Sequence, residues 1–105
     1  MRILIDECLP RELANELIGH EVKTVQEAGW AGLSNGELLE KVSGSFEVFL
    51  TIDKRIESEQ KLPGDVALIT VRAHSNRIQD LRPLVPKLLR IIDRTLPGKS
   101  ARVSG

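Results

Sequence analysis

The chain has 105 residues, of which 41% are hydrophobic and 29% are charged. This composition suits one folded domain with a modest core and argues against a disordered chain. The single cysteine, Cys8, excludes an intramolecular disulfide and a zinc site built from several cysteines. Aromatic residues make up only 3%, which argues against nucleic-acid binding by base stacking. We find no signal-peptide pattern and no run near the roughly 20 apolar residues of a membrane span, so we expect a cytoplasmic protein.

The net charge is zero, but it is unevenly distributed along the chain. Residues 1–75 hold 8 basic and 13 acidic residues, a net charge of −5, whereas residues 76–105 hold 7 basic and 2 acidic residues, a net charge of +5. An acidic first part and a basic end would suit a metal site beside a polyanion. A solvated basic helix face explains the same distribution.

The first predicted elements are a strand, a helix and a second strand. Residues 3–5 (ILI) form a short apolar run that is typical of a buried strand. A helix is expected over residues 11–18, with Ile18 on its apolar stripe, and Gly19 is placed to end it. β-branched residues then favour a strand over residues 22–25.

The middle of the chain predicts a helix and a third strand. Ser34 and Glu37 form an S-x-x-E capping box, which begins a helix expected over residues 35–43. Residues 46–52 are strongly apolar and are expected to be the third strand. Residues 54–61 are charged and predict a short surface helix or a loop.

The last part of the chain predicts a fourth strand and a long helix. Residues 66–71 (VALITV) are expected to be the fourth strand. Residues 77–96 have the periodicity of an amphipathic helix, which Pro83 and Pro86 are expected to delay or break. The small, polar residues 97–105 predict a disordered tail.

Strands that alternate with helices predict right-handed βαβ units. The expected fold is therefore α/β, a three-layer α/β/α arrangement with a parallel sheet of about four strands. It would form one domain over residues 1–96.

Two of the predicted strands run directly into acids, Asp6 and Asp53. Because parallel strands end at the same edge of a sheet, both carboxylates should emerge where α/β proteins bind ligands. Carboxylates collected there would bind Mg²⁺ or Mn²⁺, which can activate water for attack on a phosphodiester. Acids after strands are also common turn and cap formers, so that explanation stays open.

Other polar residues are expected near the same edge. Thr51 should share a sheet face with Asp53 and could supply a hydroxyl. Asn35 could act as a neutral metal ligand, and Glu37 could act as an acidic one, although the capping box explains Glu37 equally well.

Polar residues that follow the fourth strand are candidates for substrate binding. Arg72 could hold a phosphate, and Ser75 and Asn76 lie next to it in the chain. His74 is more typical of an exposed loop than of a catalytic base.

Four segments together resemble the small PIN-like domains of the DUF5615 type, which are similar to the toxin ribonucleases of bacterial and archaeal toxin–antitoxin pairs. In order and spacing, these segments are Ile3 to Arg11 (ILIDECLPR), Gly19 to Val22 (GHEV), Gly32 to Leu39 (GLSNGELL) and Leu50 to Asp53 (LTID). The resemblance covers about residues 1–92.

The resemblance implies a parallel sheet with a metal-dependent acidic site, hydrolysis of RNA by metal-activated water, and neutralisation by a small antitoxin encoded nearby. Asp6 matches the acid of the first strand, Asp53 the acid of the T-x-D motif, and Glu37 the helical glutamate. Two positions depart from the pattern: Cys8 stands where Asn is usual, and Asn35 where Asp is usual.

Two further functions stay open. The departures at Cys8 and Asn35 would weaken metal binding and favour an inactive domain that pairs with an antitoxin or with itself. A phosphoacceptor receiver domain would use acids like Asp6 and Asp53 and a threonine like Thr70. It also needs a lysine after a fifth strand, which the helical pattern from residue 77 onward does not predict.

Overall fold

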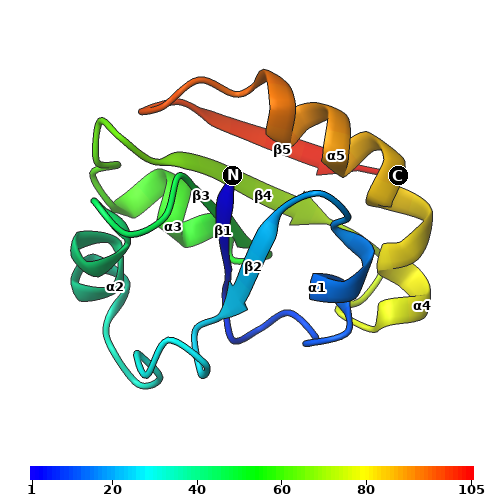
Figure 1. Ribbon diagram of the computed structural model, residues 1–105, viewed down its shortest axis with the longest axis horizontal. Coiled ribbons are helices and arrows are strands. Elements are labelled where there is room, and N and C mark those ends of the chain that lie inside the picture. The colour runs from blue at the N-terminus through cyan, green and yellow to red at the C-terminus, as the bar shows by residue number, and fades with distance from the viewer.

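The computed structural model describes residues 1–105, in which strands and helices alternate along the chain (Figure 1). The strands are β1 (Arg2–Ile5), β2 (Glu21–Thr24), β3 (Val48–Thr51), β4 (Ala67–Arg72) and β5 (Ser100–Ser104). The helices are α1 (Leu13–Glu16), α2 (Asn35–Val42), α3 (Lys54–Glu59), α4 (Ile78–Leu81), the 3₁₀ helix η1 (Arg82–Leu84) and α5 (Val85–Arg94).

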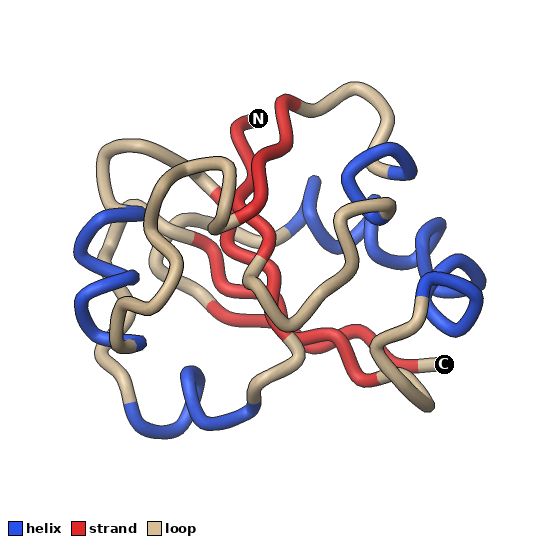
Figure 2. Tube along the Cα trace, turned by 90° about the horizontal axis from the view of Figure 1, so that it is seen from below, coloured by secondary structure: helices blue, strands red, loops and turns tan.

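All five strands run parallel in one sheet of order β2-β1-β3-β4-β5. Helices lie on both sides of this sheet (Figure 2), so the predicted three-layer α/β/α fold is confirmed. The parallel arrangement also places the carboxyl ends of all strands at one edge, as the sequence predicted.

Each face of the sheet packs into its own hydrophobic core. Leu4, Phe49 and Leu68 face α2 and α3, whereas the neighbouring strand residues Ile5 and Ile69 face α1, α4 and α5. This alternation follows from the two-residue period of a strand. The same alternation determines on which face of the sheet each polar residue at a strand end lies.

The structure corrects the prediction of a disordered tail over residues 97–105. Gly98 adopts a φ of +80°, and a Cβ at that position would lie 3.1 Å from the carbonyl oxygen of Gly64, so a tight turn brings the chain back to the sheet. Leu68 N donates to the carbonyl oxygen of Lys99 at 3.0 Å, and β5 then pairs with β4. The sheet therefore has five strands. Val103 of β5 is only 2% exposed, so the folded domain extends beyond residue 96.

The first predicted helix is shorter than expected. It covers Leu13–Glu16 instead of residues 11–18, and Ile18 is 81% exposed instead of lying on an apolar stripe. Gly19, with a φ of +89°, turns the chain directly into β2. The turn therefore takes residue 18 out of the helical repeat.

The predicted break in the long helix is confirmed, because η1 separates α4 from α5 at Pro83. The helical pattern from residue 77 onward predicted no fifth strand, and this prediction, which argued against a receiver domain, was wrong. The lysine at the fifth strand, Lys99, lies at the amino end of β5, however, and Thr70 is fully buried. Neither residue has the place that a receiver requires.

Candidate functional site

Asp6 follows β1 directly and is the most buried acid of the chain, at 8% exposure. Its Oδ1 accepts a hydrogen bond from the backbone N–H of Glu7 at 2.9 Å, and its Oδ2 accepts one from the hydroxyl of Thr51 at 2.7 Å. None of the six ion pairs includes Asp6. A buried carboxylate without a cationic partner is costly, and a bound cation would offset that cost.

Thr51 connects the two acids that end β1 and β3. Its side chain is fully buried, and its hydroxyl donates to Asp6 and accepts a hydrogen bond from the backbone N–H of Asp53 at 3.0 Å. The register places Thr51 opposite Thr70 of β4. Thr51 thus fixes the end of β3, and with it the start of α3, relative to Asp6.

Asp53 is the N-cap residue of α3, and its carboxylate forms an ion pair with Arg55. Its Oδ1 accepts from the backbone N–H of Arg55 at 2.9 Å and from Nε at 3.1 Å, while its Oδ2 accepts from Nη2 at 2.9 Å. The hydrogen bond from the Arg55 side chain is the main cause that lowers the pKa of Asp53, and the Asn35 amide contributes. Asp53 is therefore ionised and partly neutralised by a neighbour in the chain.

Asn35 and Glu37 lie in the first turn of α2. The Asn35 amide helps to lower the pKa of Asp53, whereas Glu37 has no such effect. Glu37 is exposed and completes the predicted capping box, in which its Oε1 accepts from the hydroxyl of Ser34 at 2.8 Å. These hydrogen bonds from Ser34 lower the pKa of Glu37. Hydrogen bonds link Asp6, Thr51 and Asp53 into one set, and Asn35 influences Asp53, whereas Glu37 serves the helix end.

Cys8 completes the environment of Asp6. Its thiol lies 3.4 Å from Oδ2 of Asp6 and 3.7 Å from the hydroxyl of Thr51. Burial raises the pKa of Cys8, and the charge of Asp6 adds to that effect, so the thiol stays protonated. A protonated sulfur is a poor ligand for a hard cation. The sequence did not predict the contact between this thiol and Asp6.

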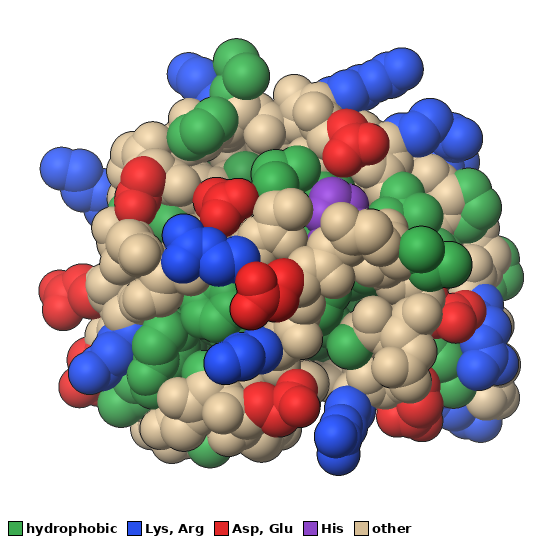
Figure 3. All heavy atoms as spheres, in the orientation of Figure 1, with side chains coloured by type: hydrophobic (Ala, Val, Ile, Leu, Met, Phe, Trp, Pro, Cys, Tyr) green, Lys and Arg blue, Asp and Glu red, His purple; other side chains and the backbone are tan.

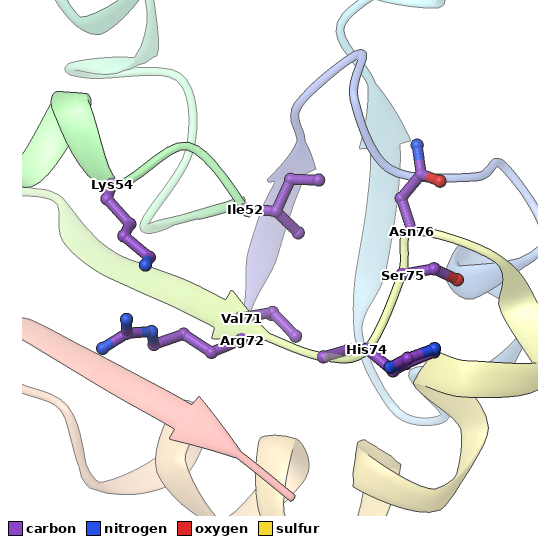
Figure 4. Close-up of a pocket in the computed structure, with 8 residues that line it drawn as sticks. Ile52, Lys54, Val71, Arg72, His74, Ser75 and Asn76 are labelled. Carbon is purple, nitrogen blue, oxygen red and sulfur yellow. The ribbon is translucent and has the colours of Figure 1, made fainter.

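A cleft of about 590 Å³ opens at the carboxyl edge between β3 and β4 (Figure 4). Arg72, Ser75 and Asn76, predicted to bind substrate, line it, whereas Thr51 is buried beside it. Figure 4 shows Lys54 and Arg72 extending to the same side of the cleft. Lys54 was not predicted, although its place directly after Asp53 at the start of α3 was a usable signal.

The polar residues of the loop after β4 are mostly held by other groups. The hydroxyl of Ser75 donates to the carboxylate of Asp80, and Nδ2 of Asn76 donates to the carbonyl oxygen of Cys8 at 3.1 Å. Arg72 and His74 are exposed. Arg72 is thus the predicted substrate residue best placed to meet an anion.

The donor set fits a hard cation in chemistry but is small. No three residues of the types His, Cys, Asp and Glu lie close enough together to hold a metal ion. The set consists of the carboxylates of Asp6 and Asp53, the hydroxyl of Thr51 and the amide of Asn35, all of which offer oxygen, the donor that Mg²⁺ and Mn²⁺ prefer. The burial of the Asp6 carboxyl group, which has no cationic partner, is the feature that most favours a cation.

Comparison with known proteins gives one match. A family model described as "PIN like domain" matches residues 1–62, which include Asp6, Asn35, Thr51 and Asp53. No curated protein and no solved structure matches the chain. None of the helices combines the length and the apolar character that a membrane crossing needs.

Proposed function

The chain belongs to the PIN-like domain family, and from this premise we propose that it is a metal-dependent ribonuclease of the DUF5615 type. The observation that carries the proposal is the carboxylate of Asp6, which is buried and without a cationic partner at the carboxyl edge of the sheet. A buried anion in such a place is expensive unless a cation joins it. Asp53, on the far side of Thr51, would be the second ligand.

Mg²⁺ or Mn²⁺ is the proposed cofactor, with Asp6 and Asp53 as ligands and Asn35 as a neutral one. Such an ion lowers the pKa of a bound water and polarises a phosphoryl oxygen. Thr51 would orient the Asp6 carboxylate through its hydrogen bond. Glu37 stays a predicted ligand, which would have to leave the hydroxyl of Ser34 to take part.

Binding of the substrate would use the cleft beside the acids. Arg72 and Lys54 can hold phosphate oxygens by charge-assisted hydrogen bonds, and Ser75 and Asn76 shape the opposite wall. Lys54 directly follows Asp53 in the chain, so a phosphodiester held by the two cations would lie at the same edge of the sheet as the proposed metal ligands. RNA is the proposed substrate, as in the family that the sequence resembles.

The test is cleavage of single-stranded and structured RNA with added Mn²⁺, with Asp6→Asn and Asp53→Asn as the variants. Both substitutions keep the shape of the side chain and remove its charge, so both should abolish cleavage. Arg82→Gln, which breaks an ion pair with Glu16 away from the cleft, is the matched control and should retain activity. Cleavage that survives both Asp substitutions would refute the proposal.

An inactive PIN-like domain that binds a protein partner is the second candidate. The Arg55 guanidinium on Asp53 and the absence of a group of three acidic or histidine ligands favour it. A calorimetric titration that detects no Mn²⁺ binding would support this candidate over the first. Under either function we propose a small antitoxin, encoded next to this chain, or a second copy of the chain as the partner, and co-purification of the neighbouring gene product tests the antitoxin.

A further inference from the structure

The exposed face of α5 carries three cations that have no acidic partner. Lys87, Arg90 and Arg94 follow one another at intervals of three and four residues, so they lie on one face of the helix. The opposite face, with Leu88 and Ile92, is buried against the sheet. The helix therefore presents a basic stripe to the surroundings, and Figure 3 shows Lys and Arg side chains projecting from the upper edge, where α5 and β5 lie.

This stripe forms one wall of a groove between α5 and β5. The groove has a volume of about 250 Å³, and its charged lining residues are Lys87, Arg90, Arg94 and Arg102. No acid lines it. Asp93, the only acid of α5, lies 4.0 Å from His20 instead. We refer to this feature as the basic groove.

The cations of the groove are only partly compensated within the protein. Arg102 pairs with Glu57 at 3.0 Å, and Lys87 donates to the carbonyl oxygen of Ser104 at 3.2 Å, a neutral acceptor. Arg90 and Arg94 take part in no ion pair or side-chain hydrogen bond of the structure. Like charges at helical spacings destabilise a helix slightly, so helix stability does not explain the stripe.

We propose that the basic groove binds the phosphate backbone of single-stranded RNA and extends the substrate-binding surface beyond the cleft. The inference rests on the proposed ribonuclease function for the identity of the ligand. It adds a second contact region, formed by the three cations of α5 together with Arg102. These residues lie outside the part of the chain that the family model matches.

Continuity with the cleft favours RNA over an acidic protein partner. Arg72 lines the cleft, and it pairs in register with Ser104, which lines the groove. A strand of RNA held at Arg72 could thus continue across the end of β5 to the α5 stripe. The groove has no aromatic lining residue, so the contacts would be to phosphates and independent of base sequence.

A simpler explanation is that the charges protect β5, because basic side chains beside an edge strand discourage pairing with other chains. The two explanations predict different results when the charges are removed. Loss of protection leads to self-association, whereas loss of a phosphate surface weakens RNA binding and reduces its salt dependence.

The experiment measures the affinity of a fluorescein-labelled oligouridine of about 20 nucleotides, long enough to reach past one binding site. Binding is followed by anisotropy in EDTA, so that no metal-dependent cleavage occurs. The test variant is Lys87→Gln/Arg90→Gln/Arg94→Gln. The control is Lys23→Gln/Lys41→Gln/Lys61→Gln, which removes the same charge from three exposed lysines outside the groove. Circular dichroism checks that both variants fold.

The groove variant should bind about 50-fold more weakly at 0.15 M salt, because three lost phosphate contacts each change the salt slope by about 0.7 on a single strand. The slope of log affinity against log salt should fall by about 2, and the control should change little. Equal losses in the two variants, no loss in the groove variant, or no binding by the wild type would each overturn the proposal. So would self-association of the groove variant with unchanged affinity.

Two further measurements separate the possible ligands and functions. The first measures the binding of polyglutamate and of anionic vesicles to the wild type and to the groove variant. If either ligand binds the wild type as tightly as RNA does and binds the groove variant more weakly, the assignment to RNA is overturned. Cleavage is assayed separately with Mn²⁺. RNA that binds through the groove but stays intact would refute the proposed ribonuclease and leave the groove standing.

Discussion

Two threonines that face each other across β3 and β4 provide the sharpest test of the site. Thr51 and Thr70 are both fully buried and pair in register. The hydroxyl of Thr51 bonds the Asp6 carboxylate and the backbone N–H of Asp53, whereas the hydroxyl of Thr70 has no hydrogen-bond partner. Replacement by valine keeps the shape and removes the hydroxyl, so the two variants should change stability in opposite directions.

For Thr51→Val, the loss of a hydrogen bond to a charged acceptor costs about 1.5–3 kcal/mol, and the unpaired N–H of Asp53 adds about 1 kcal/mol. A total near 3 kcal/mol corresponds to a fall in melting temperature of about 10–15 °C for a domain of this size. For Thr70→Val, removal of an unsatisfied buried hydroxyl should stabilise the fold by about 1 kcal/mol. The melting temperature should then rise by about 5 °C.

Urea unfolding followed by circular dichroism, with thermal melts as a second measure, gives both free energies of unfolding. Thr51→Ser and Thr70→Ser are the controls, because they keep the hydroxyl and remove only a methyl group. Thr51→Ser should therefore be less destabilised than Thr51→Val. A Thr70→Val variant that loses as much stability as Thr51→Val would refute the reasoning, since it would mean that the Thr70 hydroxyl is bonded.

Three other perturbations have defined outcomes. Arg55→Gln removes the guanidinium from Asp53 and should tighten Mn²⁺ binding about 2- to 5-fold in a calorimetric titration; weaker binding would mean that the arginine orients the ligand. Hydrogen bonds from Ser43 and Gly44 lower the pKa of Asp65. The ionised Asp65 carboxylate therefore stabilises the fold at pH values above the ordinary aspartate pKa of about 4, and this stabilisation is lost as the pH falls through the lowered pKa. Asp65→Asn should therefore melt below wild type at pH 7 and converge with it in acid, and a constant difference would contradict this. Deletion of residues 97–105 should cost at least about 3 kcal/mol, because β5 buries Val103 and pairs with β4; an unchanged melting temperature would mean that β5 is dispensable.

The elements that the sequence predicted are those with strong local signals. The three apolar runs became β1, β3 and β4, because continuous apolar residues are stable as strands only when helices cover both faces. The β-branched residues of the second predicted strand became the edge strand β2. The capping box formed as predicted because Ser34 and Glu37 satisfy each other's backbone donors without help from the rest of the fold. The placement of Asp6 and Asp53 at one edge followed from the parallel sheet.

The elements that the sequence missed depend on distant partners. The residues of β5 (SARVS) have weak strand propensity, and the strand exists because β4 offers an unpaired edge and Gly98 allows the turn toward it. The contact of Arg55 with Asp53 was also missed, although the spacing of two residues at a helix start makes it geometrically natural. Neither feature follows from hydrophobic periodicity.

A row of polar residues crosses the sheet face that packs on α3, and one of them, Thr70, has a buried hydroxyl without a partner. Asp6 bonds Thr51, and the register continues to Thr70 and Arg102 on the same face of the sheet. Apolar residues at these strand positions would extend the core between the sheet and α3, and a buried hydroxyl without a partner costs free energy. Polar residues at positions where packing alone would favour apolar ones are expected at functional sites. The row begins at Asp6, the buried acid of the proposed metal site, and ends at Arg102, which lines the basic groove. It therefore connects the proposed metal ligands with the surface that we assign to RNA.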